Sequence, residues 1–176
     1  MRREARRNSR HERVEYAGGN AQALPLHDGT IGVAWLSTVI HHFPDLAASA
    51  RELRRVLAPD GRVLIRSWFP GRGDDLLQFR YFPEGLRIAS TFPTVEATVD
   101  AFATAGFEME ALDSIPQVSA PGLRAFADRL RTRADTTLEL LSDEAFARGM
   151  AALDRAAAAE TTPTPVINHL DLLVLR

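Results

Sequence analysis

The fold is decided by IGVAWLSTVI at residues 31–40, DLAASARELRRVL at 45–57 and RVLIRSWF at 62–69. The first stretch is continuously apolar, which is typical of a strand buried on both faces of a parallel sheet. The second stretch repeats apolar residues at helical spacing and should end before Pro59 in a turn over residues 58–61. The third stretch indicates another strand. Strand, helix and strand in this order predict a βαβ unit with a right-handed crossover.

Further elements are predicted on both sides of this unit. Upstream, a brief strand is predicted at Val14–Ala17, ending at two glycines, and downstream residues 70–93 are predicted to be a long irregular segment. Thr94 is a candidate cap for a helix that Gly106 ends. The remaining predicted elements are a strand at 107–118, helices at 121–134 and 143–159, and a closing strand at 166–175.

Composition limits the chemistry. The chain has 176 residues, 45% of them hydrophobic, and a formal net charge of −2, which predicts one globular domain over residues 1–176. It has no cysteine, and every basic residue is arginine, so disulfides, thiolate metal sites and lysine Schiff bases are excluded. Neither a signal peptide nor a membrane anchor is predicted, and a cytoplasmic location is expected.

Residues 1–13 form a basic arm. Six arginines against Glu4 and Glu12 give this segment a charge of +4, since 6 − 2 = 4. Such an arm could bind phosphate backbones, but its acidic residues interrupt it and no nucleic-acid reading motif follows. We therefore interpret it as the exposed face of a surface helix, and we expect no nucleic-acid partner.

The stretch from Val14 to Phe69 resembles the middle of a class I S-adenosylmethionine-dependent methyltransferase of the type 11 branch. The matching motifs stand in the family's order: Gly19-Asn20-Ala21, Leu24-Pro25, Asp28-Gly29, His41-His42, Arg51-Glu52 with Arg55-Val56-Leu57, and Pro59-Asp60-Gly61. The resemblance implies an α/β, Rossmann-like three-layer fold with a cofactor-side region at 14–69. Residues 70–176 would then form the acceptor side, with a helical insertion and the closing strand.

Two departures from the family pattern stand out. Asn20 occupies the position of the family's aspartate, and its amide oxygen can still accept a hydrogen bond from adenine. The glycine-rich turn after the family's first strand and the acidic end of its second are absent. We therefore expect an N-terminally truncated fold without the first two strands, in which Ile31–Ser37 becomes an open edge. Such an edge favours a homodimer or a rearranged N-terminal arm.

The resemblance implies a site for S-adenosylmethionine. Its candidate residues lie in the loop after the predicted first strand and at the carboxyl end of the next, where ligands bind in open α/β sheets. They are Gly19, Asn20, Ala21, Leu36 and Ser37. The alternative is that the loop residues form only a turn.

His41 and His42 are the candidate catalytic residues. A histidine of near-neutral pKa can take the proton of a hydroxyl or amine acceptor during methyl transfer. The alternative is that one packs at a helix start and the other is solvated. A metal site with His169 is disfavoured, because adjacent histidines on a strand point in opposite directions and no ligand motif supports it. No metal is expected.

An aromatic group after the second strand is the candidate acceptor pocket. Trp68, Phe79 and Tyr81 would line it and Arg80 would hold an anionic substrate, although packing in the core is the alternative. The predicted function is therefore methyl transfer from S-adenosylmethionine to a small molecule. The alternative is a non-catalytic remnant or interaction domain, completed by a second copy or a partner chain.

Overall fold

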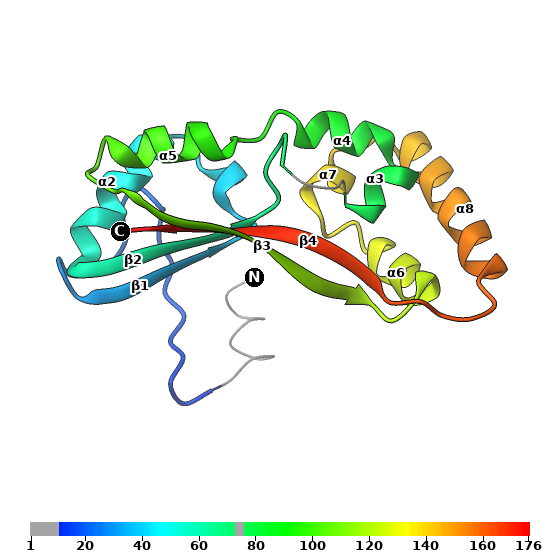
Figure 1. The fold of residues 1–176 in the computed structure, drawn as a ribbon, viewed down its shortest axis with the longest axis horizontal. Coiled ribbons are helices and arrows are strands. Elements are labelled where there is room, and N and C mark those ends of the chain that lie inside the picture. The colour runs from blue at the N-terminus through cyan, green and yellow to red at the C-terminus, as the bar shows by residue number, and fades with distance from the viewer. Residues whose placement is uncertain (1–10, 73–75) are drawn as a thin grey trace.

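A computed structural model of the chain describes residues 11–72 and 76–176, so most of the basic arm, residues 1–10, lies outside the described residues. The fold is mixed α/β (Figure 1). Its elements in chain order are β1 (Ile31–Ser37), the 3-10 helix η1 (Ile40–His42), α2 (Leu46–Val56), β2 (Leu57–Ser67), α3 (Leu77–Tyr81), α4 (Pro83–Ala89), α5 (Val95–Ala103), β3 (Met109–Ala120), α6 (Leu123–Leu130), α7 (Thr136–Glu139), α8 (Asp143–Ala159) and β4 (Val166–Leu175).

The predicted βαβ unit is present. Asp45 begins α2 by accepting a hydrogen bond from the amide of Ala48, and β1 pairs in parallel with β2. The turn predicted at residues 58–61 is wrong, because β2 already begins at Leu57. Ile31 of β1 pairs with Leu57 of β2, but Val33 pairs with Arg62. Residues 58–61 therefore form an irregularity within β2.

The sheet has the order β1-β2-β4-β3, with β4 antiparallel to both of its neighbours. Strand β1 therefore lies at an edge, as expected from the sequence. The prediction that residues 31–40 are buried on both faces is wrong: Val33 and Trp35 are 53% and 55% exposed. Helices α2 and α5 lie above this half of the sheet in Figure 1, and the described chain before β1 rises from beneath the sheet to α2, where the amide of Leu24 donates to Glu52.

Two core clusters lie at opposite ends of the sheet. The first is built around Ile65 and Leu173 with residues of α2 and α5, and the second around Phe126 and Leu153 of α6 and α8. Strand β4 reaches both, and its buried face changes along its length. The buried residues are Val166, Asn168 and Leu170 in its first half and Asp171, Leu173 and Leu175 in its second.

Several further expectations can be compared with the structure. The helix capped by Thr94, the helix at 143–159 and the closing strand at 166–175 are confirmed. Val14–Ala17 forms no strand, since the residues there are irregular and mostly exposed. The irregular segment predicted at 70–93 contains α3 and α4, and the helix predicted at 121–134 ends at Leu130.

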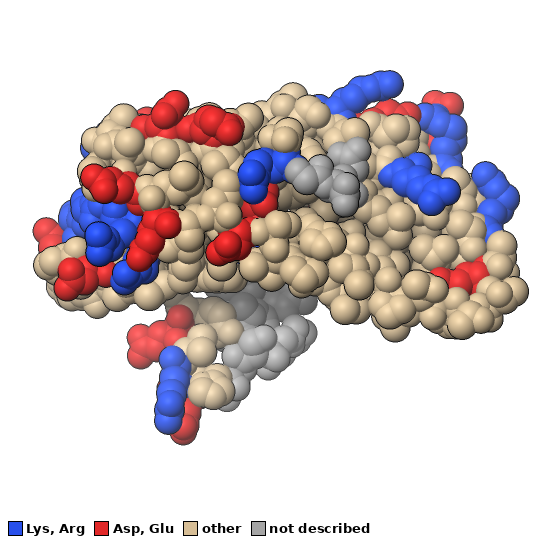
Figure 2. All heavy atoms as spheres, in the orientation of Figure 1, with Lys and Arg blue, Asp and Glu red and all other residues tan. Residues whose placement is uncertain are grey.

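Charged side chains of both signs are interspersed over the α2–α5 end of the face seen in Figure 2. No helix in residues 11–72 or 76–176 is long and apolar enough to cross a membrane.

Candidate functional site

The carboxyl ends of β1 and β2 lie at the same edge of the sheet because the two strands are parallel. After β1 the chain turns at Thr38, whose φ is 51° and whose amide donates a hydrogen bond of 2.8 Å to the Arg66 carbonyl oxygen. The turn directs the chain into η1, so both histidines follow the strand end closely. This edge is the place where an open α/β sheet binds its ligand.

His41 and His42 both reach one hydroxyl group. The Nε2 atoms of His41 and His42 lie 3.2 and 3.3 Å from Thr136 Oγ1, and their rings are 4.1 Å apart. The argument that adjacent histidines must point apart fails here, because they belong to a 3-10 helix and not to a strand. Phe92 stacks on His41 with ring centroids 4.3 Å apart.

Burial sets the protonation of His41. It lowers the pKa of His41 below the ordinary 6.5, and the neighbouring His42 lowers this pKa further, while Asp135 acts in the opposite direction. His41 is therefore neutral at pH 7, and a neutral imidazole can accept a proton.

The two histidines line a cavity of about 190 Å³, which we call the histidine lobe. The predicted acceptor residues Trp68 and Phe79 also line it and contact each other edge to face at 5.4 Å between ring centroids. The buried indole N–H of Trp68 has no hydrogen-bond partner among the described residues. The lobe's remaining residues are Thr38, Ser67, Leu76, Gln78, Ala89, Phe92, Ala134, Asp135, Thr136, Thr137 and Leu170.

The structure does not bring the other two predicted acceptor residues to this lobe. Tyr81 packs against the second core cluster, and Arg80 is exposed on α3. Sequence reasoning also missed Thr136, which lies 95 positions after His41. The only signal for it was local: Asp135 followed by two threonines is a helix start, and Asp135 does accept a hydrogen bond from the amide of Thr137.

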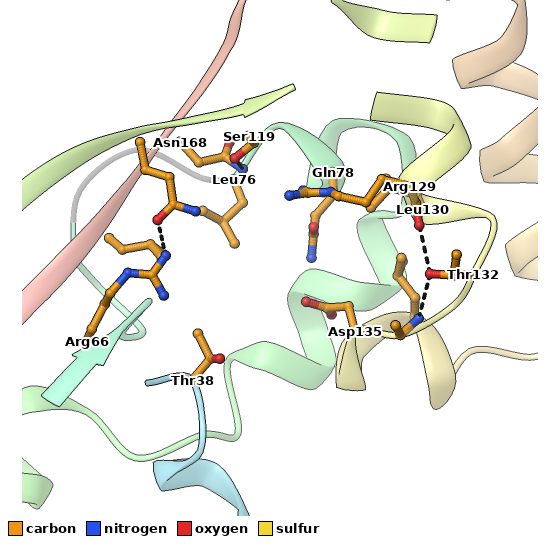
Figure 3. Close-up of a pocket in the computed structure, with 14 residues that line it drawn as sticks. Thr38, Arg66, Leu76, Gln78, Ser119, Arg129, Leu130, Thr132, Asp135 and Asn168 are labelled. Atoms are coloured by element: carbon orange, nitrogen blue, oxygen red, sulfur yellow. Dashed lines mark hydrogen bonds between the residues drawn. The ribbon is translucent and has the colours of Figure 1, made fainter. Parts of the chain in front are cut away.

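A second cavity of about 330 Å³ adjoins the histidine lobe, and we call it the arginine lobe. The two lobes share Thr38, Leu76, Gln78, Ala134, Asp135 and Leu170. Figure 3 shows the side chains of Arg66 and Arg129 entering the arginine lobe from opposite sides. Neither arginine was singled out from the sequence. Its other residues are Gln117, Ser119, Leu130, Thr132, Leu138 and Asn168.

A third cavity, the apolar slot, lies along β1 and has a volume of about 260 Å³. Of the predicted cofactor residues, Ala21 and Leu36 line it. Asn20 stands next to it, exposed, and its Oδ1 accepts a hydrogen bond of 3.0 Å from the amide of Gln22. The other lining residues are Leu24, Leu26, Ile31, Val33, Ala34, Trp35, Phe43, Leu53 and Val56.

The two remaining predicted cofactor residues have structural contacts. A Cβ on Gly19 would lie 2.8 Å from Cδ of Pro25, so the loop can close there only around a glycine. The hydroxyl of Ser37 accepts a hydrogen bond of 2.8 Å from Arg66. Ser37 therefore joins the end of β1 to the arginine lobe rather than to the slot.

Glu52 and Arg55 of α2 fix the loop that carries Asn20 and Ala21. The carboxylate of Glu52 accepts hydrogen bonds from the amide of Leu24 at 2.7 Å and from Arg55. Arg55 also donates to the carbonyl oxygen of Leu26 and is paired with Asp28. The hydrogen bonds from Arg55 and Leu24 lower the pKa of Glu52 to about 2. Glu52 and Arg55 therefore hold the loop of Asn20 and Ala21 against α2.

The slot's chemistry can be compared with S-adenosylmethionine. Apolar walls suit a purine ring, and Asn20 at the slot's margin offers amide hydrogen-bonding groups for the polar edge of that ring. The residues lining the slot include no carboxylate for ribose hydroxyls. The described residues thus fit the adenine end of this cofactor. They also contain no group of three or more side chains placed to hold a metal ion.

Comparison with known proteins agrees with this geometry. Over 94% of its length the chain superimposes on 74% of an Anabaena variabilis protein described as a methyltransferase of an antibiotic biosynthesis pathway, with a TM-score of 0.71 and 16% identity. It also superimposes on 61% of the cyclase SpnF, with a TM-score of 0.56 and 18% identity. The fold is therefore the Rossmann-like methyltransferase fold, and the α/β class predicted from the sequence is confirmed.

Sequence comparison agrees with the family resemblance of residues 14–69. Residues 1–65 match the family described as Methyltransferase domain. Among curated proteins, 27-O-demethylrifamycin SV methyltransferase of Amycolatopsis mediterranei is 24% identical over 77% of this chain and 50% of its own length. Demethylmenaquinone methyltransferase of Corynebacterium kroppenstedtii is 38% identical over 32% of this chain and 24% of its own. The chain is thus similar to class I S-adenosylmethionine-dependent methyltransferases, and it spans half or less of these two relatives.

Proposed function

We propose that this chain takes part in methyl transfer from S-adenosylmethionine to a small hydroxylated molecule, with His41 as the general base. The observation that carries the proposal is the cleft at the carboxyl ends of β1 and β2, in which a neutral His41 lines the lobe. Relatives named for methylating small molecules support it. The cytoplasmic location expected from the sequence stays part of the proposal.

In this proposal the apolar slot holds the adenine ring, with Asn20 and Ala21 at its polar edge. The bound cofactor supplies a methyl group on a positively charged sulfur. Methyl transfer is an in-line displacement, so the chain's part is to place the acceptor and exclude water. Trp68, Phe79 and Phe92 of the histidine lobe serve this purpose, since their rings form apolar walls around the acceptor.

At its Nδ1 atom, His41 takes the proton that the acceptor hydroxyl loses, because its Nε2 atom is engaged by Thr136 Oγ1. Thr136 orients its ring, because Thr136 Oγ1 lies within hydrogen-bond distance of Nε2 in both His41 and His42. In this role Thr136 is a positioning residue, while His41 touches the acceptor. Proton removal by a well-placed base contributes about 10²–10⁴-fold to a rate.

Cofactor binding is tested by calorimetric titration with S-adenosylhomocysteine. We expect binding at micromolar concentrations, a loss of about tenfold in Asn20→Leu and retained affinity in Asn20→Asp, because aspartate keeps an acceptor for the adenine amino group. Gln22→Ala in the same loop is the control. If no heat of binding is measured at about 1 mM ligand, S-adenosylmethionine is not the cofactor of this chain, and the enzymatic proposal is wrong.

Catalysis is tested with radiolabelled S-adenosylmethionine and 4-hydroxybenzoate as the probe. We expect His41→Gln to lower kcat by about 10²-fold or more, with little change in the affinity for S-adenosylhomocysteine. His169→Gln is the matched control, because His169 lies exposed on β4 and lines neither lobe. Equal rates in His41→Gln and the parent protein would contradict the role of His41.

The exposed edge of β1 favours a second candidate function, that of a non-catalytic interaction domain. An edge strand presents unpaired backbone groups, and Ile31–Ser37 carries no charged residue or proline to oppose pairing. The occupant in this alternative is a second copy of the chain, since two uncharged β1 strands can pair without repulsion. The SpnF likeness shows that this fold is not tied to one reaction.

Light scattering tests this alternative. We expect a dimer that Val33→Lys converts to a monomer, because a lysine on the edge opposes pairing. Val118→Lys is the control on the opposite edge strand, where Val118 is 65% exposed. A monomeric parent protein whose β1 amides are nevertheless protected from hydrogen exchange would overturn the dimer.

A further inference from the structure

The arginine lobe has a charge that the proposed methyl transfer does not use. Two guanidinium groups face it, from Arg66 on β2 and Arg129 on α6, and among its lining residues the single carboxylate is Asp135. That carboxylate already accepts a hydrogen bond of 2.9 Å from the amide of Thr137 at the start of α7. The lining residues therefore leave the lobe with one positive charge in excess.

Neither guanidinium group pairs with a carboxylate in the described part of the chain. Arg66 donates hydrogen bonds to Ser37 Oγ and to the side-chain oxygen of Gln117, both of which are neutral. Within residues 11–72 and 76–176, the guanidinium group of Arg129 contacts only the ring of Phe126, whose centroid lies 5.2 Å from the Arg129 Cζ. By contrast, Arg131, two positions further on, is paired with both Asp128 and Asp154.

The framework around these two arginines is held by internal hydrogen bonds. Asn168 donates to Ser119 Oγ at 3.0 Å and accepts from the amide of Leu77, and Gln78 donates to Thr137 Oγ1 at 3.3 Å. These amides are already engaged, and the hydrogen-bond partners of Arg66 are neutral, so the charge of the two guanidinium groups is what the lobe offers to a ligand. A planar guanidinium binds a carboxylate through two parallel hydrogen bonds.

We propose that the arginine lobe binds a carboxylate group of the methyl acceptor, which makes the acceptor a hydroxylated aromatic carboxylic acid. This inference rests on the proposed function for the identity of its ligand. The acceptor's ring lies among Trp68, Phe79 and Phe92 with its hydroxyl toward His41, and its carboxylate extends past Thr38 and Gln78, which the two lobes share. Arg129 and Arg66 receive the carboxylate.

Equilibrium binding tests this proposal without any catalytic step. Calorimetric titrations would compare 4-hydroxybenzoate with 4-hydroxybenzamide, which has nearly the same shape but no charge. We expect the carboxylate to bind at least about tenfold more tightly than the amide. Arg129→Gln should abolish that preference. Arg87→Gln, an exposed arginine on α4, is the control and should keep it.

Two outcomes would overturn the proposal: equal affinity for the acid and the amide, or an undiminished preference in Arg129→Gln. Failure of both probes to bind at about 10 mM would overturn it as well. Arg129 is exposed at the end of α6, so its replacement should leave the fold intact, which circular dichroism checks. If the chain binds 4-hydroxybenzoate but not S-adenosylhomocysteine, the anion site in the arginine lobe is supported and the proposed methyltransferase function is contradicted.

Discussion

The two halves of the molecule differ in how far apart in the sequence their contacting segments lie. In the β1–α2–β2 half, neighbouring segments pair with each other, and the first core cluster joins them to α5 and the end of β4. In the other half, α3, α4 and α7 are short, and they form a core by packing with α6, α8 and the start of β4. The βαβ unit of the first half and the long helix α8 were therefore predictable from local pattern, whereas the placement of α3, α4 and α7 depends on contacts between distant residues.

The largest expected effect concerns whether the two halves unfold together. Ile65 of the first core and Leu153 of the second are both fully buried, so Ile65→Ala and Leu153→Ala should each lower the free energy of unfolding by about 2–5 kcal/mol. Because β4 reaches both clusters, we expect one cooperative transition in each variant.

Tryptophan fluorescence makes this measurement selective in a Trp68→Phe background, because Trp68 contacts Phe79 of α3. Trp35 lies on β1, so its fluorescence then reports on the first half, while circular dichroism reports on helices of both. Coincident urea transitions would support one cooperative unit. A Leu153→Ala protein that loses helix before its fluorescence changes would show instead that the second half unfolds alone.

A smaller effect is expected at Gly149, where α8 meets the chain between α3 and α4. A Cβ there would lie 2.3 Å from two ring carbons of Phe82 and 2.8 Å from the carbonyl oxygen of Tyr81. Gly149→Ala should therefore lower the free energy of unfolding by about 1–3 kcal/mol, despite alanine's higher helix propensity.

The matched control is Gly85→Ala on α4. A Cβ at Gly85 would meet Thr137 at an ordinary 3.6 Å, so this change should be neutral or stabilise by up to about 1 kcal/mol. Urea denaturation of both variants measures the difference. Equal stability of the two variants would mean that α8 can shift away from Phe82, and that the second half packs less rigidly than the first.

The contrast also explains what sequence reasoning found and missed. The helix at 143–159 and the strand at 166–175 were predicted because each is long enough to show its period and has a clear start signal or a polar linker. Helices α3 and α4 have five and seven residues, too few to show one. Val33 and Trp35 are exposed because burial depends on which helices cover a face, and that is decided outside the strand.

The candidate site divides in the same way. His41, Trp68 and Phe79 were found because they follow the ends of β1 and β2, where an open α/β sheet binds ligands. Thr136 and Arg129 belong to α7 and α6, and no local pattern marks them as neighbours of His41. Their place became known only from the folded chain.

A modest, pH-dependent effect is expected in the loop that α2 holds. The pKa of Glu52 is lowered to about 2, so the stability that this carboxylate contributes is present above its ordinary value of 4.5 and is lost as the pH falls toward 2. Glu52→Gln should cost about 1 kcal/mol at pH 7 and progressively less below pH 4.5.

Asp154→Asn on α8 is the control, because Asp154 belongs to an exposed ion pair with Arg131. Its effect should be smaller than that of Glu52→Gln at pH 7. Chemical denaturation across the acid range measures both variants. If Glu52→Gln cost the same at every pH, the hydrogen bonds from Leu24 and Arg55 could not be what positions the loop.

The smallest expected effect, and the most direct test of how the two halves meet, is the titration of His41. Its pKa lies below 6.5 because of burial, and the charge of His42 lowers it further, while Asp135 raises it. Nuclear magnetic resonance titration of the imidazole should therefore show His42→Gln raising the pKa of His41 and Asp135→Asn lowering it. Asparagine keeps the capping oxygen at the start of α7, so the second change alters charge more than structure.

The lowered pKa of His41 also affects stability. Since the folded-state pKa is depressed, neutral His41 contributes stability above pH 6.5 that is lost as the pH falls, and His41→Gln should make that loss smaller. Shifts of the His41 pKa of the same sign in His42→Gln and Asp135→Asn would mean that Asp135, and with it the second half of the molecule, does not act on the histidine lobe.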